Sequence, residues 1–196
     1  MMPRVKTVVA TLSLASLAAC VSLGNEPPDS LLTLTANTSV PAGASAAGAP
    51  GSALALAEFE APAAIDVVRV PVTVSESELA YLKDAVWVEK PARLFRRLVA
   101  ETIRTRSNRV VIDGSNPGLG VRDGLSGTIR EFGYDAPTSS VVIVFDAVRR
   151  GSDAQIMTQR FESRVSGIPA EVEFVGPALN QVANDVAGQI ADWMGE

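Results

Sequence analysis

The segment over residues 176–196, GPALNQVANDVAGQIADWMGE, carries the clearest periodic pattern in the sequence. Its apolar residues recur every three or four positions, which is the spacing of one face of an α-helix. Pro177 suits the first turn of such a helix, where its missing N–H has no partner to lose. The apolar face consists of Leu179, Val182, Ala183, Val186, Ala187, Ile190 and Met194. A stripe this wide has to be covered by another layer of secondary structure, so the rest of the chain must supply one.

A second amphipathic helix is expected over residues 91–106. Pro91 stands where a first helical turn tolerates proline. Apolar residues then follow at helical spacing, namely Leu94, Phe95, Leu98, Val99 and Ile103. The remaining surface of this helix carries four arginines, Arg93, Arg96, Arg97 and Arg104.

Extended segments account for much of the remaining chain. They have β-branched, apolar or alternating character and cover residues 31–35, 53–60, 67–74, 109–113, 125–133, 139–149 and 155–166. Pro71 implies an edge position or a bulge in its strand, and residues 75–84 are less regular. The pattern predicts an α+β fold, an antiparallel or mixed sheet of about five to six strands with both amphipathic helices on one face.

Residues 155–166 show the alternation of a strand that has one buried face. We expect Met157, Phe161 and Val165 to share the apolar face. The other face is predicted to be solvated and carries Thr158, Arg160, Glu162 and Arg164.

The first 20 residues resemble a bacterial export signal that ends in a lipidation site. Arg4 and Lys6 are followed by an apolar segment, Val8 to Ala19. This segment is too short to cross a bilayer core, because a spanning helix needs about 20 residues. Leu17-Ala18-Ala19-Cys20 is similar to the lipobox of lipoproteins, in which the cysteine becomes the acylated N-terminus. We therefore expect residues 1–19 to be a signal peptide and Cys20 to carry the acyl chains.

Other roles for Cys20 need groups that the sequence lacks. It is the only cysteine, and the sequence contains no histidine. A disulfide would need a thiol from another chain, a zinc site would need more Cys or His ligands, and a nucleophilic cysteine usually works with a histidine base. An incidental cysteine in a plain secretory signal remains the alternative.

A lipid-anchored chain of this kind belongs to the periplasmic side of a bacterial envelope. Val21 and Ser22 follow the cysteine where enteric inner-membrane lipoproteins have aspartate, which favours the outer membrane by resemblance. We expect residues 20–30 to be a tether and residues 31–196 a single periplasmic domain. Within it, the Ala-, Gly-, Ser- and Pro-rich residues 37–52 are predicted to form a flexible loop.

Composition narrows the functional classes. The formal net charge of −5 argues against a nucleic-acid partner. Hydrophobic residues make up 47% of the chain but aromatic residues only 5%, so the core should be mainly aliphatic. No G-x-S-x-G elbow and no histidine for a catalytic triad is present. The sequence predicts no active site, no metal site and no cofactor.

The order of these elements resembles the ABC-type transport auxiliary lipoprotein family. The resemblance rests on LLTLT after a lipobox, on WVEKP (residues 87–91) before the first helix, and on an alanine-rich last helix that ends near Trp193. Its most specific element is the signature Trp87-x-Glu89-x-Pro91. The chain departs from the family in having Leu32 where a tyrosine is common, and in its long segment 37–52.

The resemblance implies a non-enzymatic accessory of an MCE-type lipid transport system. Its implied partners are a periplasmic MCE-domain protein and an inner-membrane ABC permease and ATPase, and a homo-oligomer is a further candidate assembly. The alternatives are an outer-membrane assembly lipoprotein, similar to the small subunit of the lipopolysaccharide-export translocon, and an envelope hydrolase that uses a serine or carboxylate alone.

Two groups of residues are candidate functional positions. Trp87 could dock a partner, but a large aromatic next to a helix start is more often a core residue, and Glu89 would complement the helix dipole. The arginines Arg93, Arg96, Arg97 and Arg104 could contact a partner or anionic lipid headgroups. The alternative for these arginines is a solvated helix face whose long side chains cover apolar surface.

Overall fold

The structure is a computed structural model that describes residues 30–48, 53–107, 109–113 and 121–195. The predicted signal peptide, Cys20 and nearly all of the tether lie outside these residues. The elements follow the order β1 (Leu54–Glu60), β2 (Arg69–Thr73), β3 (Leu79–Val86), α1 (Pro91–Arg106), β4 (Val111–Asp113), β5 (Asp123–Asp135), β6 (Ser140–Arg150), β7 (Ile156–Ser166) and α2 (Val172–Gly195).

The sheet is mixed and is organised around β5, its longest strand. One edge of β5 pairs antiparallel with β6, which pairs antiparallel with β7. The other edge of β5 pairs in parallel with β1 through residues 123–128 and with β2 through residues 134–135. β4 extends the sheet beyond β1, and β3 extends it beyond β2. The sheet thus has seven strands, where the sequence predicted about five to six.

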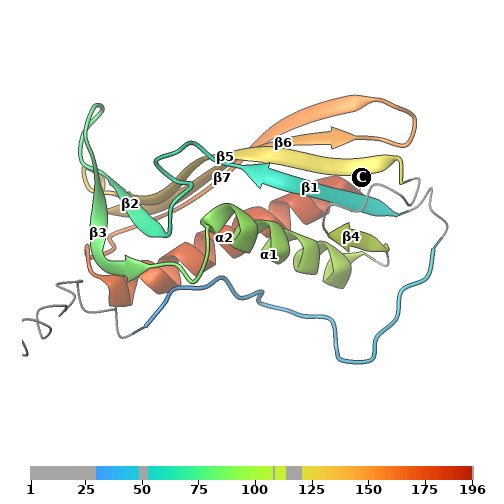
Figure 1. Ribbon diagram of the computed structural model, residues 1–196, viewed down its shortest axis with the longest axis horizontal. Helices are drawn as coiled ribbons and strands as arrows, with labels where there is room; N and C mark the ends of the chain where they lie inside the picture. The colour runs from blue at the N-terminus through green and yellow to red at the C-terminus, as the bar shows by residue number, and fades with distance from the viewer. Residues whose placement is uncertain (1–29, 49–52, 108, 114–120, 196) are drawn as a thin grey trace, which may run out of the picture.

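Both helices lie on the same side of this sheet, as Figure 1 shows, so the predicted α+β layering is confirmed. The apolar stripe of α2 is buried, and Val182, Val186 and Ile190 are each 0% exposed. Aliphatic side chains dominate the core, but a cluster of aromatic rings lies at its centre. The ring centroids of Phe95 and Phe145 are 5.3 Å apart, and Phe59 lies within 5.9 Å of both.

The last helix begins earlier than the sequence predicted. Pro177 lies inside α2, which already starts at Val172, so the prediction that Pro177 opens the helix was wrong. Val175 extends the apolar stripe by one turn upstream and is 0% exposed. Burial of Val175 helps to offset the hydrogen bond that the proline nitrogen cannot donate within the helix.

The strand predicted over residues 31–35 does not form. Only Leu32 makes a β-bridge, parallel to Trp87. A strand that was not predicted is β3, because its residues are mostly exposed and show no clear alternation. The prediction for Pro71 is confirmed, since the register between β2 and β3 shifts between Arg69 and Pro71.

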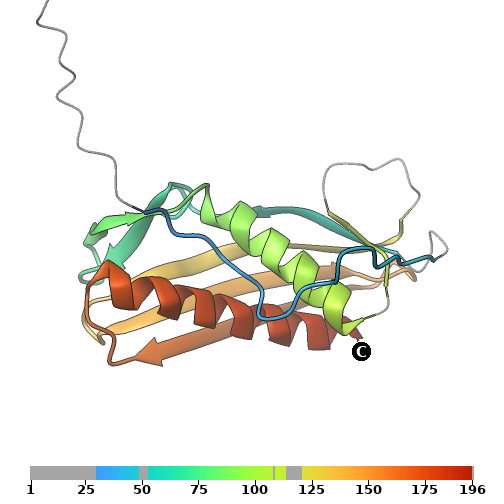
Figure 2. The ribbon, with the colours of Figure 1, turned by 90° about the horizontal axis from the view of Figure 1, so that it is seen from below.

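Residues 30–48, which we call the strap, run over the helices instead of joining the sheet (Figure 2). Burial alternates along the first part of the strap, with Leu32, Leu34 and Ala36 partly buried and their neighbours exposed. The apolar residues of this alternating pattern are therefore buried by packing against helices, and not against a sheet. That distinction between a helix surface and a sheet surface is not visible in sequence periodicity alone.

Candidate functional site

Trp87 joins the sheet, the strap and the start of α1. The residue follows β3, is 2% exposed, and its ring lies 5.4 Å from that of Phe132. Its backbone N–H donates to the Val68 carbonyl at 2.6 Å. The indole Nε1 is buried without a hydrogen-bond partner among the described residues. Trp87 is therefore a core residue in this structure, as favoured from sequence.

The strap is fixed at this same point by backbone hydrogen bonds. The Leu32 N–H donates to the Val86 carbonyl at 2.7 Å, and the Leu32 carbonyl accepts from the Val88 N–H at 2.8 Å. The signature before α1 thus holds the chain segment that leads back toward the N-terminus. This geometry gives the WVEKP stretch a structural role beyond starting a helix.

The rest of the signature prepares the first turn of α1. Lys90 is the N-cap, has no capping side-chain hydrogen bond, and pairs through Nζ with Asp66 at 2.6 Å. Pro91 occupies the first turn, as predicted. Glu89 accepts a hydrogen bond from Arg97, two turns into the helix. Its carboxylate therefore lies close to the positive end of the helix dipole and to a cation.

The four arginines of α1 do not form one exposed patch. The Arg96 side chain is 11% exposed, bonds to Asp113 and lies 3.4 Å from a Glu58 carboxylate oxygen. Arg104 lies 3.6 Å from Glu101 and donates to the Val111 carbonyl at 3.1 Å. These two arginines link α1 to β1 and to β4, so their contacts are structural.

Arg93 and Arg97 are the members of this set that face solvent. Arg97 is half exposed and is paired with Glu89. Arg93 is exposed, and no carboxylate among the described residues forms an ion pair with it. Contact with a partner or a headgroup therefore remains a prediction that fits these two positions best.

Two asparagines of α2 hold the strap, and sequence reasoning did not single them out. The Asn180 Oδ1 accepts from the Thr35 N–H at 2.8 Å. Asn184 is 8% exposed, accepts from the Asn37 N–H at 2.9 Å and donates to the Thr35 carbonyl at 2.9 Å. The available signal was the presence of two asparagines four residues apart in an alanine-rich helix, where polar side chains on one face need partners.

The strap is held once more by α1. Glu101 accepts from the Val40 N–H at 2.7 Å. Beyond this point, residues 41–48 are all exposed. Together, the contacts from Leu32 to Val40 bind the strap to both helices and to the end of β3.

Two hollows lie along the strap. One of about 300 Å³ lies between Val40, residues 44–46 and the end of α1. Another of about 430 Å³ lies between Ser30 to Thr33 and the first turns of α2. No group of Cys, Asp or Glu in the described part of the chain is arranged to hold a metal ion. Nor do the described helices include one with the length and apolar character to span a bilayer.

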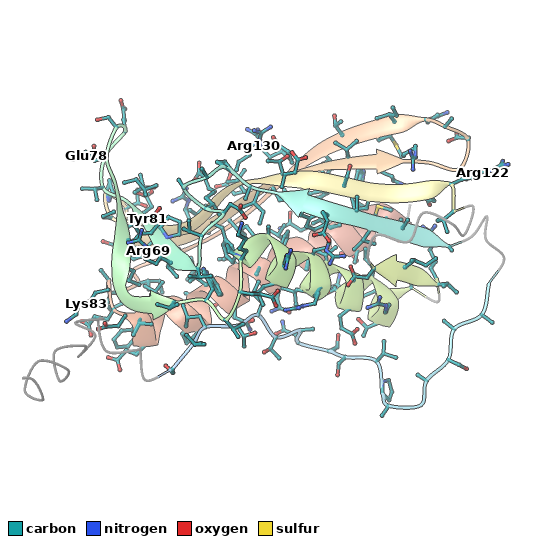
Figure 3. The ribbon with its side chains drawn as sticks, in the orientation of Figure 1. Arg69, Glu78, Tyr81, Lys83, Arg122 and Arg130 are labelled. Carbon is teal, nitrogen blue, oxygen red and sulfur yellow. The ribbon has the colours of Figure 1, made fainter. Side chains whose placement is uncertain are left out.

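A second charged network crosses the sheet on the side opposite the helices. The Asp146 carboxylate of β6 accepts from Arg160 Nε of β7 at 2.6 Å and from Arg130 Nε of β5 at 2.7 Å. Figure 3 shows Arg130 on the side of the sheet away from the helices. Hydrogen bonds from Arg160, and next from Arg130, hold the pKa of Asp146 well below its ordinary value.

Two solved structures support the fold, and a third is more distantly similar. A crystal structure of protein XCC0632 from Xanthomonas campestris is 19% identical, covers 84% of this chain and 94% of its own, and superposes with a TM-score of 0.68. A crystal structure of an uncharacterised protein is 14% identical, covers 74% of this chain and 93% of its own, and has a TM-score of 0.63. A PelC dodecamer from Paraburkholderia phytofirmans is 14% identical over 75% of this chain and 92% of its own, with a TM-score of 0.43. No curated protein matches the sequence.

The sequence also matches a family model. The model describes the ABC-type transport auxiliary lipoprotein component and matches residues 32–187. This range begins at the bridge between Leu32 and Trp87, includes most of the strap and the whole sheet, and ends within α2. The chain therefore belongs to the ABC-type transport auxiliary lipoprotein component family.

Proposed function

We propose that this chain is a membrane-anchored periplasmic lipoprotein that serves an MCE-type ABC transporter as a non-enzymatic accessory. Such a system moves lipids or other hydrophobic molecules between the inner and outer membranes. Family membership over residues 32–187 is the single observation that carries the proposal. The lipobox-like Leu17-Ala18-Ala19-Cys20 supports the anchor and its periplasmic location.

The anchor would act through acyl chains on Cys20. Each buried methylene contributes about 0.8 kcal/mol, so two or three acyl chains hold a folded domain at a bilayer persistently. The segment from Cys20 to Ser30 can span at most about 35 Å when extended. The domain would then work close to its membrane, and the outer membrane is the one that Val21 and Ser22 favour.

The proposed partners are a periplasmic MCE-domain protein and the permease and ATPase of the inner membrane. The exposed Arg93 and Arg97 are the proposed positions of contact on α1, for a partner or for anionic headgroups. Arg96 and Arg104 are the less suitable members of the predicted set, because the Arg96 side chain is 11% exposed and that of Arg104 is 32% exposed.

The anchor is tested by mass spectrometry of the mature N-terminus and by fractionation of the full-length chain. We expect Cys20 to carry acyl chains, and we expect Cys20→Ala to release the chain from outer-membrane fractions. Ser22→Ala is the matched control and should stay in the membrane fraction. An unmodified Cys20, or a Cys20→Ala variant that still sediments with outer membranes, would contradict the anchor.

The transporter role is tested by crosslinking and capture from envelopes that contain the full-length chain. We expect an MCE-domain protein among the captured partners, and a smaller yield with Arg93→Glu. The exposed Arg122 provides the control substitution Arg122→Glu, since it lies away from α1 (Figure 3). Capture of a large outer-membrane barrel in place of any MCE-domain protein would favour an assembly lipoprotein and would overturn the proposal.

A further inference from the structure

β7 forms an open edge of the sheet. It comprises 11 residues and, among the described residues, pairs with β6 alone. Figure 2 shows β7 lying beyond α2, at the margin of the molecule. Ile156 is 70% exposed and Met157 is 38% exposed, so the start of the strand is apolar and uncovered. Long open edges of this kind can pair with another strand unless something prevents it.

The hairpin with β6 determines which residues of β7 bond to β6 and which direct their backbone groups to the open edge; we call this the phase of β7. The Gly151 N–H donates to the Gln155 carbonyl at 2.8 Å, and the register continues from there, with Arg149 opposite Met157 and Phe145 opposite Phe161. In an antiparallel ladder the bonded pairs alternate. Odd-numbered residues of β7 therefore bond to β6, and even-numbered residues direct their N–H and C=O groups to the open edge.

A contact from α2 agrees with this phase. Gln189 Nε2 donates to the carbonyl of Glu162, an even-numbered residue, at 3.2 Å. Among the residues that the structure describes, Gln189 provides the one hydrogen bond to a backbone group at this edge. The edge is thus almost fully available to a partner strand.

The charges on this edge decide which strand it can accept. Natural edges often carry lysine or other charges that oppose pairing. Here the charges alternate in sign, as Arg160, Glu162 and Arg164. A strand with this order has opposite charges on neighbouring edge positions, so it can complement a second copy of itself.

The phase, the charges and the extent of overlap together select one register. Two copies of β7 can pair antiparallel only with even-numbered residues opposite even-numbered residues, since both must direct their bonding groups to the shared edge. A pair centred on Phe161 places Arg160 opposite the second copy's Glu162 and overlaps all 11 residues of the strand. A centre one residue earlier would oppose Arg160 to itself, and a centre one residue later would oppose Glu162 to itself, which is destabilising in either case. A centre on Ser163 would oppose Glu162 to Arg164 but would overlap only residues 160–166 of the strand.

We propose that β7 pairs with β7 of a second copy of this chain, antiparallel and centred on Phe161, so that the sheet continues across a two-fold axis. Arg160 uses Nε and Nη2 for Asp146, and Nη1 remains to meet Glu162 of the second copy. On the helix side of the sheet, Met157 lies opposite Val165 of the second copy. This pairing covers part of the exposed apolar surface at the start of β7.

Disulfide trapping tests the register directly. In the proposed pair, Gln159 lies opposite Ser163 of the second copy at a position without backbone hydrogen bonds, where side chains approach most closely. Within one chain these residues are roughly 13 Å apart, which is too far for a disulfide. The full-length Gln159→Cys/Ser163→Cys variant, purified in mild detergent and oxidised, should run as a covalent dimer on non-reducing gels.

Two controls make the trapping decisive. The wild-type chain reports any dimer that forms through Cys20. In Gln159→Cys/Val165→Cys the two thiols would lie opposite each other only if the pair were centred on residue 162 instead of Phe161. This variant should therefore give several-fold less dimer. Absence of a covalent dimer, equal yields in both registers, or a disulfide adduct with a different protein would each overturn the proposal.

Charge exchange tests the same register independently. When it is added to the Gln159→Cys/Ser163→Cys variant, Glu162→Arg should lower the yield of covalent dimer several-fold, because it places an arginine opposite Arg160 of the second copy. Combining it with Arg160→Glu should restore the dimer, because opposite charges face each other again. Glu162→Arg leaves the contacts of Arg160 with Asp146 in place, and it removes the half-exposed ion pair of Glu162 with Arg164 at 3.7 Å, a kind of pair that contributes little to folding. A single variant that traps like its parent would exclude this pairing. Because Arg160→Glu also removes the contacts with Asp146, a double variant excludes the pairing when it keeps the folded circular dichroism of its parent and still does not recover the dimer.

Discussion

At the scale of single residues, backbone approach constrains this sheet as strongly as side-chain packing does. Gly127 of β5 lies where the strand passes close to the Phe145 ring. A Cβ at this position would lie 2.3 Å from a ring carbon of Phe145 and 2.4 Å from the Asp146 carbonyl oxygen. Those distances are far inside van der Waals contact, so the glycine is required for β5 and β6 to approach each other in this way.

We expect Gly127→Ala to lower the free energy of unfolding by about 1 to 3 kcal/mol, because the added methyl group overpacks the core. Gly124→Ala is the matched control on the same strand, where the nearest atoms would lie at ordinary contact distances of 3.5 and 3.7 Å. That variant should change the free energy of unfolding by less than about 0.5 kcal/mol. Chemical denaturation of both measures the difference, and equal values for the two variants would show that β5 and β6 separate freely at this point.

At the scale of elements, the sequence predicted well those segments whose own periodicity records their burial. The helix over residues 91–106 was predicted with the bounds that α1 has, and the three consecutive strands β5, β6 and β7 were predicted within a few residues. α1 has one apolar face that meets the core, which produces a clear period, whereas β6 is recognised by a continuous apolar run, Val141 to Phe145, that is buried on both faces.

Elements whose environment comes from distant parts of the chain were harder to predict. Residues 31–35 alternate like a strand, yet their partners are Asn180 and Asn184, nearly 150 residues away. β3 lacks alternation because it lies beyond β2 at the edge of the sheet and is mostly exposed. Likewise the arginines of α1 looked like one patch in sequence, whereas Glu58 and Asp113 withdraw Arg96 from the surface.

The charged network between β5, β6 and β7 makes a pH-dependent contribution to stability. Hydrogen bonds from Arg160 and then Arg130 lower the pKa of Asp146 below its ordinary value of 3.8. A lowered pKa in the folded state stabilises the fold above the unfolded pKa, and this stabilisation is lost as the pH falls through the folded pKa. We therefore expect Asp146→Asn to be less stable than wild type at pH 6, with a gap that narrows as the pH falls below about 4.

Urea titrations at a series of pH values measure that gap. Asp84→Asn is a suitable control, because the Asp84 side chain is 68% exposed and its nearest cation, on Lys83, is 3.9 Å away. Asparagine also tolerates the positive φ of 58° at this position. A gap for Asp146→Asn that stays constant down to pH 2 would show that the carboxylate charge does not stabilise the three strands.

At the scale of the whole molecule, the strap connects elements that lie far apart in the sequence. It runs over both helices (Figure 2) and binds the last helix, the first helix and the end of β3. Its first fixed point is Leu32, whose backbone bonds to Val86 and Val88 join it to the end of β3, and its hydrogen bonds with the helices begin at Thr35. The strap is held mainly by side chains on helix surfaces, so it can open as a unit while the sheet stays folded.

Asn184→Ala tests whether the strap is such a unit. The substitution removes the acceptor of the Asn37 N–H and the donor to the Thr35 carbonyl, which should lower stability by about 1 to 3 kcal/mol locally. Hydrogen exchange followed by mass spectrometry should show faster exchange in residues 32–40 and unchanged exchange in β5, β6 and β7. Gln181→Ala, an exposed position on the same helix, should leave both regions as in wild type. Equal loss of protection in the strap and in the sheet would mean that the strap and the sheet unfold together, because a cooperative domain has no separate opening of this segment.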